Sequence, residues 1–225
     1  MQTQIQAPPK GWSRTEMAAM IAAEVTDGWC VNLGIGSPLE IANHFLPGRE
    51  VVLHSENGVF GMGPIQDPPV DTWVVNAGKQ NVHLRTGASI TDHATSFAFI
   101  RGGHIDLCVL GAFEVAVNGD IANWTASHDL SSLPAVGGAM DLAVGAKNLW
   151  VMMQHTTKTG EPKLLNQCTL PLTATRAVDR VYTNLAVLDV FDGAFVVREM
   201  HPDVSLEQLV EWTQGPIVEG PVPEH

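Results

Sequence analysis

A regular alternation of short apolar runs and helical patterns is the feature that most constrains the fold of this chain. The apolar runs at 30–33 and 105–110 have the length and the flanking turn residues of buried strands. Helical patterns precede and follow these runs. A chain of this kind buries its strands in a sheet and packs the connecting helices on its faces. The sequence therefore predicts the α/β fold class, with an open, mainly parallel sheet and helices on both faces.

Two capping boxes mark expected helix starts. Ser13 and Glu16 have capping-box spacing before an alanine-rich run, and they predict a helix there. Ser37 and Glu40 repeat the spacing, with Pro38 at the expected first helical position. Other patterns predict short helices at 94–101 and 139–146, strands at 73–75, 148–154 and 181–190, a hairpin at 113–124 with a primed turn, and a last helix from 205 to 212.

The composition and the net charge argue against several classes of function. The chain has 225 residues and a formal net charge of −12, which argues against nonspecific binding to nucleic acid or to an anionic membrane. The sequence holds no apolar run near the ~20 residues that a spanning helix needs, and its first residues lack the apolar core of a secretory signal. We expect one domain at 13–215, with an N-terminal arm at 1–12 and a C-terminal tail at 216–225.

The three cysteines, Cys30, Cys108 and Cys168, lie among apolar or small neighbours. They are expected to be buried free thiols, which favours a reducing, cytoplasmic location. No pair of histidines has the spacing of a metal site, so no metal is expected.

Glu56 stands where the apolar run at 51–53, an expected strand, ends and an expected glycine-rich loop begins. Ligands of open α/β folds bind outside the carboxyl ends of the strands, so this carboxylate is a candidate functional group. It could attack an acyl group as a nucleophile, or it could be a solvated turn residue. Its position alone does not decide between the two.

Two glycine turns are candidate sites for negative charge. Gly34 and Gly36 follow a strand and open a helix, where backbone N–H groups can receive an anion. Gly137 and Gly138 precede a helical pattern at Ala139, where backbone amides can stabilise an oxyanion. Each pair can equally be structural, as a connecting turn or as a site of close helix packing.

The chain resembles the B subunits of the 3-oxoacid CoA-transferase family, and 3-oxoadipate B subunits most of all. The resemblance runs from about 13 to about 215 and starts from Ser55-Glu56-Asn57-Gly58. It includes, in order, the segments Asn32-Leu33-Gly34-Ile35-Gly36, Asn76-Ala77-Gly78-Lys79, Arg101-Gly102-Gly103-His104, Gly119-Asp120-Ile121-Ala122-Asn123-Trp124, Gly137-Gly138-Ala139-Met140-Asp141-Leu142 and Cys168-Thr169-Leu170-Pro171-Leu172-Thr173.

The resemblance implies a role for each candidate residue. Glu56 would be the nucleophile that forms a glutamyl-CoA thioester. Residues that bind substrate or CoA would be Asn32, Gly34, Gly36, Asn57 and Lys79. The oxyanion would be stabilised by amides at Gly137, Gly138 and Ala139. No cofactor is implied beyond the coenzyme A thioester, which is a substrate.

The implied reaction moves CoA from succinyl-CoA to a 3-oxoacid, with 3-oxoadipate preferred, as in aromatic degradation. The implied partner is a CoA-transferase A subunit, in a heterotetramer. Alternatives are an acetoacetate-type or short-chain CoA-transferase subunit, an acyl-CoA hydrolase on the same scaffold, and a noncatalytic binding or regulatory subunit. A serine hydrolase centred on Ser55 is disfavoured, because the Gly-x-Ser-x-Gly pattern is lacking there.

Overall fold

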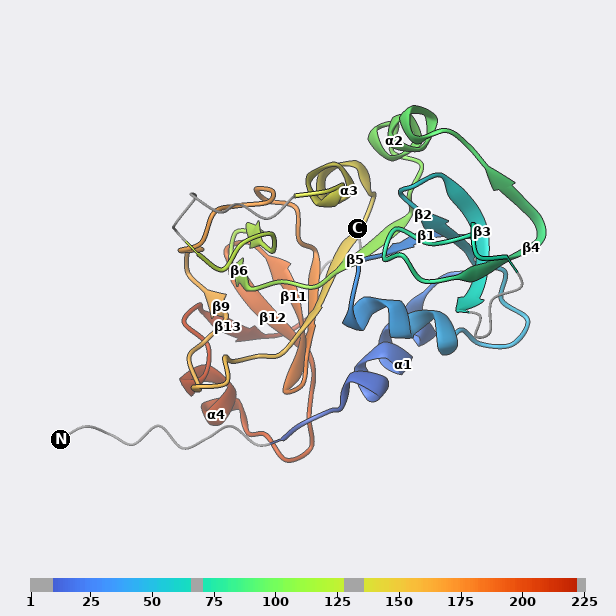
Figure 1. Cartoon of the computed structure of the whole chain (residues 1–225). Helices are drawn as coiled ribbons and strands as arrows, with labels where there is room; N and C mark the ends of the chain where they lie inside the picture. The colour runs from blue at the N-terminus through green and yellow to red at the C-terminus, as the bar shows by residue number, and fades with distance from the viewer. Residues whose placement is uncertain (1–9, 66–70, 128–135, 222–225) are drawn as a thin grey trace. The chain divides into compact units, whose positions relative to one another are not determined.

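The computed structural model describes residues 10–65, 71–127 and 136–221 (Figure 1). The first nine residues of the predicted arm, residues 66–70 and 128–135, and the last four residues of the tail lie outside these ranges. The chain divides into two compact units. We call them the α/β unit, Ala18–Gly111 with Val136–Trp150, and the β-rich unit, Met1–Met17 with Ala112–Ala135 and Val151–His225. The single domain at 13–215 stays a prediction.

Parallel strands form the centre of the sheet in the α/β unit. Strand β1 (Cys30–Leu33) pairs in parallel with β2 (Val52–Ser55) on one side and with β5 (Leu107–Leu110) on the other. All four residues of β5 are buried, as expected for a strand covered on both faces. Beyond β2 the sheet continues with two antiparallel strands, β3 (Val59–Ile65) and β4 (Val82–Ile90).

Helices cover both faces of this sheet. The helical elements are α1 (Arg14–Glu24), the 3-10 helix η1 (Ser37–Asn43), α2 (His93–Arg101) and α3 (Ala139–Gly145). In Figure 1, α2 lies above the strands of the α/β unit and η1 lies below them, and α2 contacts α3. The predicted α/β class, with its parallel strands and helices on both faces, is confirmed.

One of the two predicted capping boxes is wrong. Ser13 and Glu16 form a box at the start of α1, with Ser13 N donating to Glu16 Oε2 at 2.7 Å. At η1 the cap position belongs to Gly36, whose φ is 93°, and no side chain caps the helix. The left-handed backbone of a glycine moves the helix start one residue earlier than the serine predicts. Pro38 accordingly lies in the first turn but not at its first position.

Two predicted strands are also wrong. Residues 73–75 make only an isolated bridge, Val75 to Asn81, and Trp73 is 89% exposed, because the segment leads into a turn at 76–80. The run at 181–190 is a hairpin, β10 (Arg180–Thr183) with β11 (Ala186–Phe191), rather than one strand. The reversal falls at Thr183 and Asn184, polar residues that the prediction of one continuous strand did not use.

The β-rich unit holds the remaining elements. They are the strands β6 (Glu114–Ala116), β7 (Ile121–Ala122), β9 (Leu164–Leu165), β12 (Ala194–Met200) and β13 (Ile217–Glu219), and the helix α4 (Leu206–Glu211). Strand β8 (Leu149–Met153) begins in the α/β unit and ends in this one.

The predicted hairpin at 113–124 is present as β6 and β7, and its turn differs from the expected primed type. Gly119 N donates to Ala116 O, and Ala116 N donates to Asp120 O, so three residues form the loop. Gly119 has a φ of 85° and Asn118 is not left-handed, whereas a primed type I turn needs a positive φ at both central residues.

In the described residues, no helix is long and apolar enough to cross a bilayer.

Candidate active site

Glu56 begins the tight turn that joins β2 to β3. Gly58 N donates to Ser55 O at 2.9 Å, and Ser55 pairs with Val59 across the hairpin. Gly58 has a φ of 109°, and a Cβ there would lie 2.2 Å from Thr91 O, so only glycine fits this turn. The predicted position of Glu56 at a strand end is correct. The expected glycine-rich loop is instead strand β3, which is irregular around Met62.

The Glu56 carboxylate lies against the glycine pair at the start of α3. A Cβ added to Gly138 would lie 2.5 Å from Oε2 and 2.9 Å from Cδ of Glu56. A Cβ on Gly137 would lie 3.8 Å from Oε1. The fold therefore brings the predicted nucleophile and two predicted oxyanion residues together, and Ala139 follows as the first residue of α3.

Burial raises the pKa of Glu56 above its ordinary value. A hydrogen bond from the Gly138 backbone and the charge of His93 lower this pKa in part, while the charge of Asp141 raises it. Asp141 forms an ion pair with Arg101, with 2.7 Å between Oδ1 and Nε. The carboxylate is thus half-buried and partly stripped of water, with one backbone donor directed at it, an environment suited to nucleophilic attack.

Asn32 lies in the interior, where it pairs with His54 of the strand that leads to Glu56. It is 4% exposed, and its Nδ2 lies 3.0 Å from His54 Nδ1 and 3.3 Å from His54 O. His54 Nε2 in turn lies 2.9 Å from Ser96 Oγ. The amide nitrogen of Asn32 is thus occupied by His54, and the contact of Asn32 with substrate stays a prediction.

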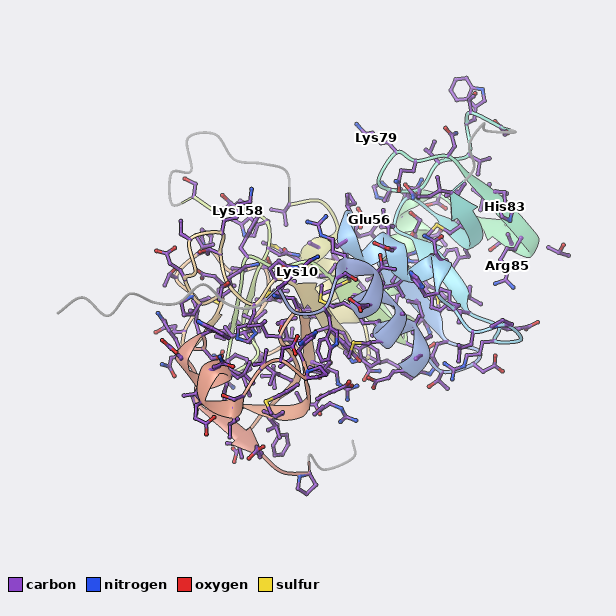
Figure 2. All side chains as sticks on the ribbon, turned by 90° about the horizontal axis from the view of Figure 1, so that it is seen from below. Lys10, Glu56, Lys79, His83, Arg85 and Lys158 are labelled. Carbon is purple, nitrogen blue, oxygen red and sulfur yellow. The ribbon has the colours of Figure 1, made fainter. Side chains whose placement is uncertain are left out.

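Lys79 lies on a turn that is attached to both chain neighbours of Glu56. Ala77 N donates to Ser55 Oγ at 2.8 Å, and Asn57 Nδ2 donates to Val75 O at 2.8 Å. Lys79 itself has a φ of 62° and an exposed side chain. Figure 2 shows Lys79 extending away from the body of the α/β unit, whereas Glu56 lies nearer to that body. Asn57 anchors the turn through this bond, and its contact with substrate stays a prediction.

The first glycine turn is largely structural. Gly34 N donates to Val109 O at 2.8 Å, so this amide is used in the sheet. A Cβ on Gly34 would lie 3.0 Å from Leu110 Cδ2, so the glycine permits close packing. Gly36 is exposed at the start of η1. Of the two interpretations of this turn, the structure supports the connecting one for Gly34.

Four residues of the site region were not anticipated from the sequence. His54 and Ser96 connect the strand end to α2, Phe97 packs 3.1 Å from the Cβ position of Gly138, and His93 acts electrostatically on Glu56. The one indication of them in the sequence was the place of His54, two residues before Glu56. In the described part of the chain, no group of three or more His, Cys, Asp or Glu side chains is arranged to hold a metal ion.

Comparison with known proteins shows the family to which the chain belongs. The family model for coenzyme A transferase matches residues 14–212. The chain is 51% identical over 210 residues to the B subunit of 3-oxoadipate CoA-transferase from Pseudomonas putida, covering 93% of this chain and 98% of the relative. It is 44% identical over 204 residues to the B subunit of the probable succinyl-CoA:3-ketoacid coenzyme A transferase from Bacillus subtilis, covering 90% of this chain and 94% of that protein.

Solved structures agree on the fold. An acyl-CoA transferase from Escherichia coli O157:H7 matches 98% of this chain with a TM-score of 0.70 at 19% identity, and this chain spans 43% of its length. Glutaconate coenzyme A-transferase from Acidaminococcus fermentans matches 96% of this chain and 92% of its own with a TM-score of 0.60 at 17% identity. The chain belongs to the coenzyme A transferase family, and the resemblance seen in the sequence is confirmed.

Proposed function

We propose that this chain is the B subunit of an enzyme that transfers CoA from succinyl-CoA to a 3-oxoacid, with 3-oxoadipate as the preferred acceptor. The relatives at 51% and 44% identity are named as B subunits of a 3-oxoadipate and a succinyl-CoA:3-ketoacid transferase. The observation that carries the proposal is the half-buried Glu56 carboxylate at the end of β2, held against the Gly138 backbone.

The proposed chemistry passes through two covalent states of Glu56. Its ionised carboxylate attacks the thioester carbonyl of succinyl-CoA, which expels CoA thiolate and leaves a glutamyl–succinyl anhydride. The thiolate then attacks the γ-carbonyl of Glu56, releases succinate and forms a glutamyl-CoA thioester. The acceptor carboxylate reverses both steps, which regenerates Glu56 and yields the new acyl-CoA.

The glycine pair has a defined task in this scheme. Attack on the γ-carbonyl of Glu56 places negative charge on a side-chain oxygen. The Gly138 N–H already donates to this carboxylate, so it can stay with that oxygen as the charge develops. We assign the oxyanion donors to the amides at 137–139. A preorganised backbone donor needs no rearrangement when the tetrahedral intermediate forms.

Substrate contacts are proposed for the exposed groups around Glu56. Lys79 is the proposed cation for an anionic part of CoA, and the turn that carries it is fixed to Ser55 and Asn57. Gly36 is proposed to border the CoA site at the start of η1. Asn32 and Gly34 support this site from within, through their bonds to His54 and Val109.

We further propose a heterotetramer with a CoA-transferase A subunit, because the relatives are named as B subunits. The coenzyme A thioester is a substrate, and the scheme requires no other cofactor. Cys30, Cys108 and Cys168 are free thiols, but only Cys108 is buried; the expected burial of Cys30 and Cys168 is wrong, since both are partly exposed. The free thiols support a cytoplasmic location. The net charge of −12 supports small-molecule and protein partners over nucleic acid and anionic membranes.

Co-expression with an A subunit, followed by assay with succinyl-CoA and a set of acids, tests the proposal. We expect transfer to 3-oxoadipate in preference to acetoacetate and short-chain acids, and no transfer by the Glu56→Gln variant. Release of free CoA without an acceptor would instead assign a hydrolase. Normal transfer by Glu56→Gln would refute the role of Glu56.

A further inference from the structure

We propose that His54 is a positioning residue that fixes the reactive carboxylate of Glu56 by joining three elements around it. The inference rests on the proposed function, since it concerns the same nucleophile. His54 is fully buried on β2, two residues before Glu56. Its partners are Asn32, on the neighbouring strand β1, and Ser96, on helix α2.

The hydrogen bonds define the protonation of the imidazole ring. Asn32 Nδ2 lies 3.3 Å from His54 O, which only accepts hydrogen bonds, so the atom placed there must be the amide donor. The same nitrogen lies 3.0 Å from His54 Nδ1, which therefore accepts. The ring proton then resides on Nε2, which donates to Ser96 Oγ at 2.9 Å. Burial also lowers the pKa of His54 to about 4, so the ring is neutral at neutral pH.

Helix α2, which His54 holds through Ser96, also carries residues that act on the Glu56 carboxylate. Phe97, next to Ser96, packs 3.1 Å from the Cβ position of Gly138, the residue that bonds Glu56. His93, on the same helix, acts electrostatically on Glu56. A shift of α2 relative to β2 would therefore move the groups that surround the nucleophile.

Two aromatic rings hold the imidazole in place. The ring centroid of Phe60 lies 4.5 Å from that of His54, and that of Phe99 lies 6.2 Å away. Phe60 belongs to β3 and Phe99 to α2, so packing and hydrogen bonds together restrain the elements around the ring. The ring is thus restrained at both nitrogens and by its aromatic neighbours.

Substitutions of His54 in the assembled enzyme separate positioning from bulk packing. Glutamine offers one acceptor and one donor group, so His54→Gln is expected to keep kcat within about threefold of wild type. His54→Leu offers neither, and we expect kcat to fall by about 10- to 100-fold with KM little changed, because a small displacement of a nucleophile costs rate rather than affinity. His201→Leu is the matched control: His201 belongs to the β-rich unit, contacts Trp12 with ring centroids 5.3 Å apart, and its replacement is expected to leave kcat unchanged.

A second variant keeps the test decisive if His54→Leu fails to fold. Ser96→Ala removes only the acceptor of the Nε2 proton, and we expect a drop in kcat of about 3- to 10-fold without a change in KM. Wild-type kcat in folded His54→Leu or in Ser96→Ala would overturn the positioning role, as would equal losses in His54→Gln and His54→Leu. Nitrogen-15 spectra of histidine-labelled enzyme should show a neutral ring protonated at Nε2, and protonation at Nδ1 would also overturn it. If the wild-type assembly transfers no CoA, the proposed function fails first.

Discussion

At the scale of single residues, the site depends on a close approach that only glycine permits. The φ of Gly138 is −86°, which any residue can adopt, so its requirement is spatial: the Glu56 carboxylate occupies the place of a Cβ. Gly58, by contrast, is required both for its left-handed backbone and for its contact with Thr91. The two glycines fix the nucleophile from its own turn and from the helix opposite.

Gly138→Ala should therefore impair catalysis. The new methyl group would lie 2.5 Å from Glu56 Oε2 and 3.1 Å from Phe97 Cζ, so the carboxylate must move. We expect kcat to fall by about 10²-fold in a steady-state transfer assay. Val144→Ala is the control, since Val144 lies on the same helix and is 74% exposed. Unchanged kcat in Gly138→Ala would contradict the placement of the carboxylate.

Glu56→Gln should stabilise the protein at neutral pH while it abolishes transfer. Folding raises the pKa of Glu56, mainly through burial, so the ionised form costs stability above that pKa. Removal of the charge should therefore raise the free energy of unfolding at pH 7. This increase should vanish as the pH falls below the pKa of an unfolded glutamate, about 4. Thermal unfolding at pH 7 and pH 4 measures this, with the exposed Glu199→Gln as control. Destabilisation at pH 7 would contradict the pKa direction.

At the scale of elements, local signals in the sequence predicted some features well and missed others. Strand β1 has the predicted bounds, and α2 begins one residue before its prediction, because Asp92 caps it by accepting from Thr95 N at 2.9 Å. The start of η1 was missed because a glycine backbone, which leaves no side-chain pattern, took the cap position. The hairpin of β10 and β11 was missed because apolar residues flank Thr183 and Asn184 on both sides and resemble one continuous run.

The site itself was predictable in part. The end of β2 and the start of α3 were each recognisable from turn residues near Glu56 and Gly138. Their contact is long-range, so it depends on how the chain crosses the sheet rather than on local spacing. The roles of Asn32 and Asn57 could not be separated from substrate contacts by sequence, because a polar side chain at a strand end can bond inward or outward.

The capping boxes allow a matched stability test. In the box of α4, Ser205 Oγ accepts from Gln208 N at 3.3 Å, and Ser205 N donates to Gln208 Oε1 at 3.0 Å. Ser205→Ala should lower the free energy of unfolding by about 1 kcal/mol. Ser37→Ala should have a much smaller effect, because η1 has no side-chain cap. Denaturant titration measures both, and equal losses would contradict the assignment of Gly36 as the cap.

At the scale of the whole molecule, the relatives match nearly the whole of this chain and are themselves B subunits. The proposed reaction needs space for a CoA thioester beside Glu56 and exclusion of water from the glutamyl-CoA intermediate. We assign part of that task to the A subunit. In this proposal the chain provides the nucleophile, and the heteromer provides the complete site.

The purified chain alone should accordingly show no CoA transfer. Addition of the A subunit should restore activity in proportion to complex formation, followed by size-exclusion chromatography in parallel with the transfer assay. A complex formed with Glu56→Gln is the control, because it should assemble normally and stay inactive. Full activity of the isolated chain would contradict the need for a partner.

The most direct test of the central claim is to find CoA on Glu56. The assembled enzyme is incubated with succinyl-CoA in the absence of acceptor, quenched, digested and analysed by mass spectrometry. We predict a CoA thioester on the side chain of Glu56, which borohydride reduces and which an added 3-oxoacid removes. An unmodified Glu56 peptide in a mixture that is actively transferring CoA would contradict the account.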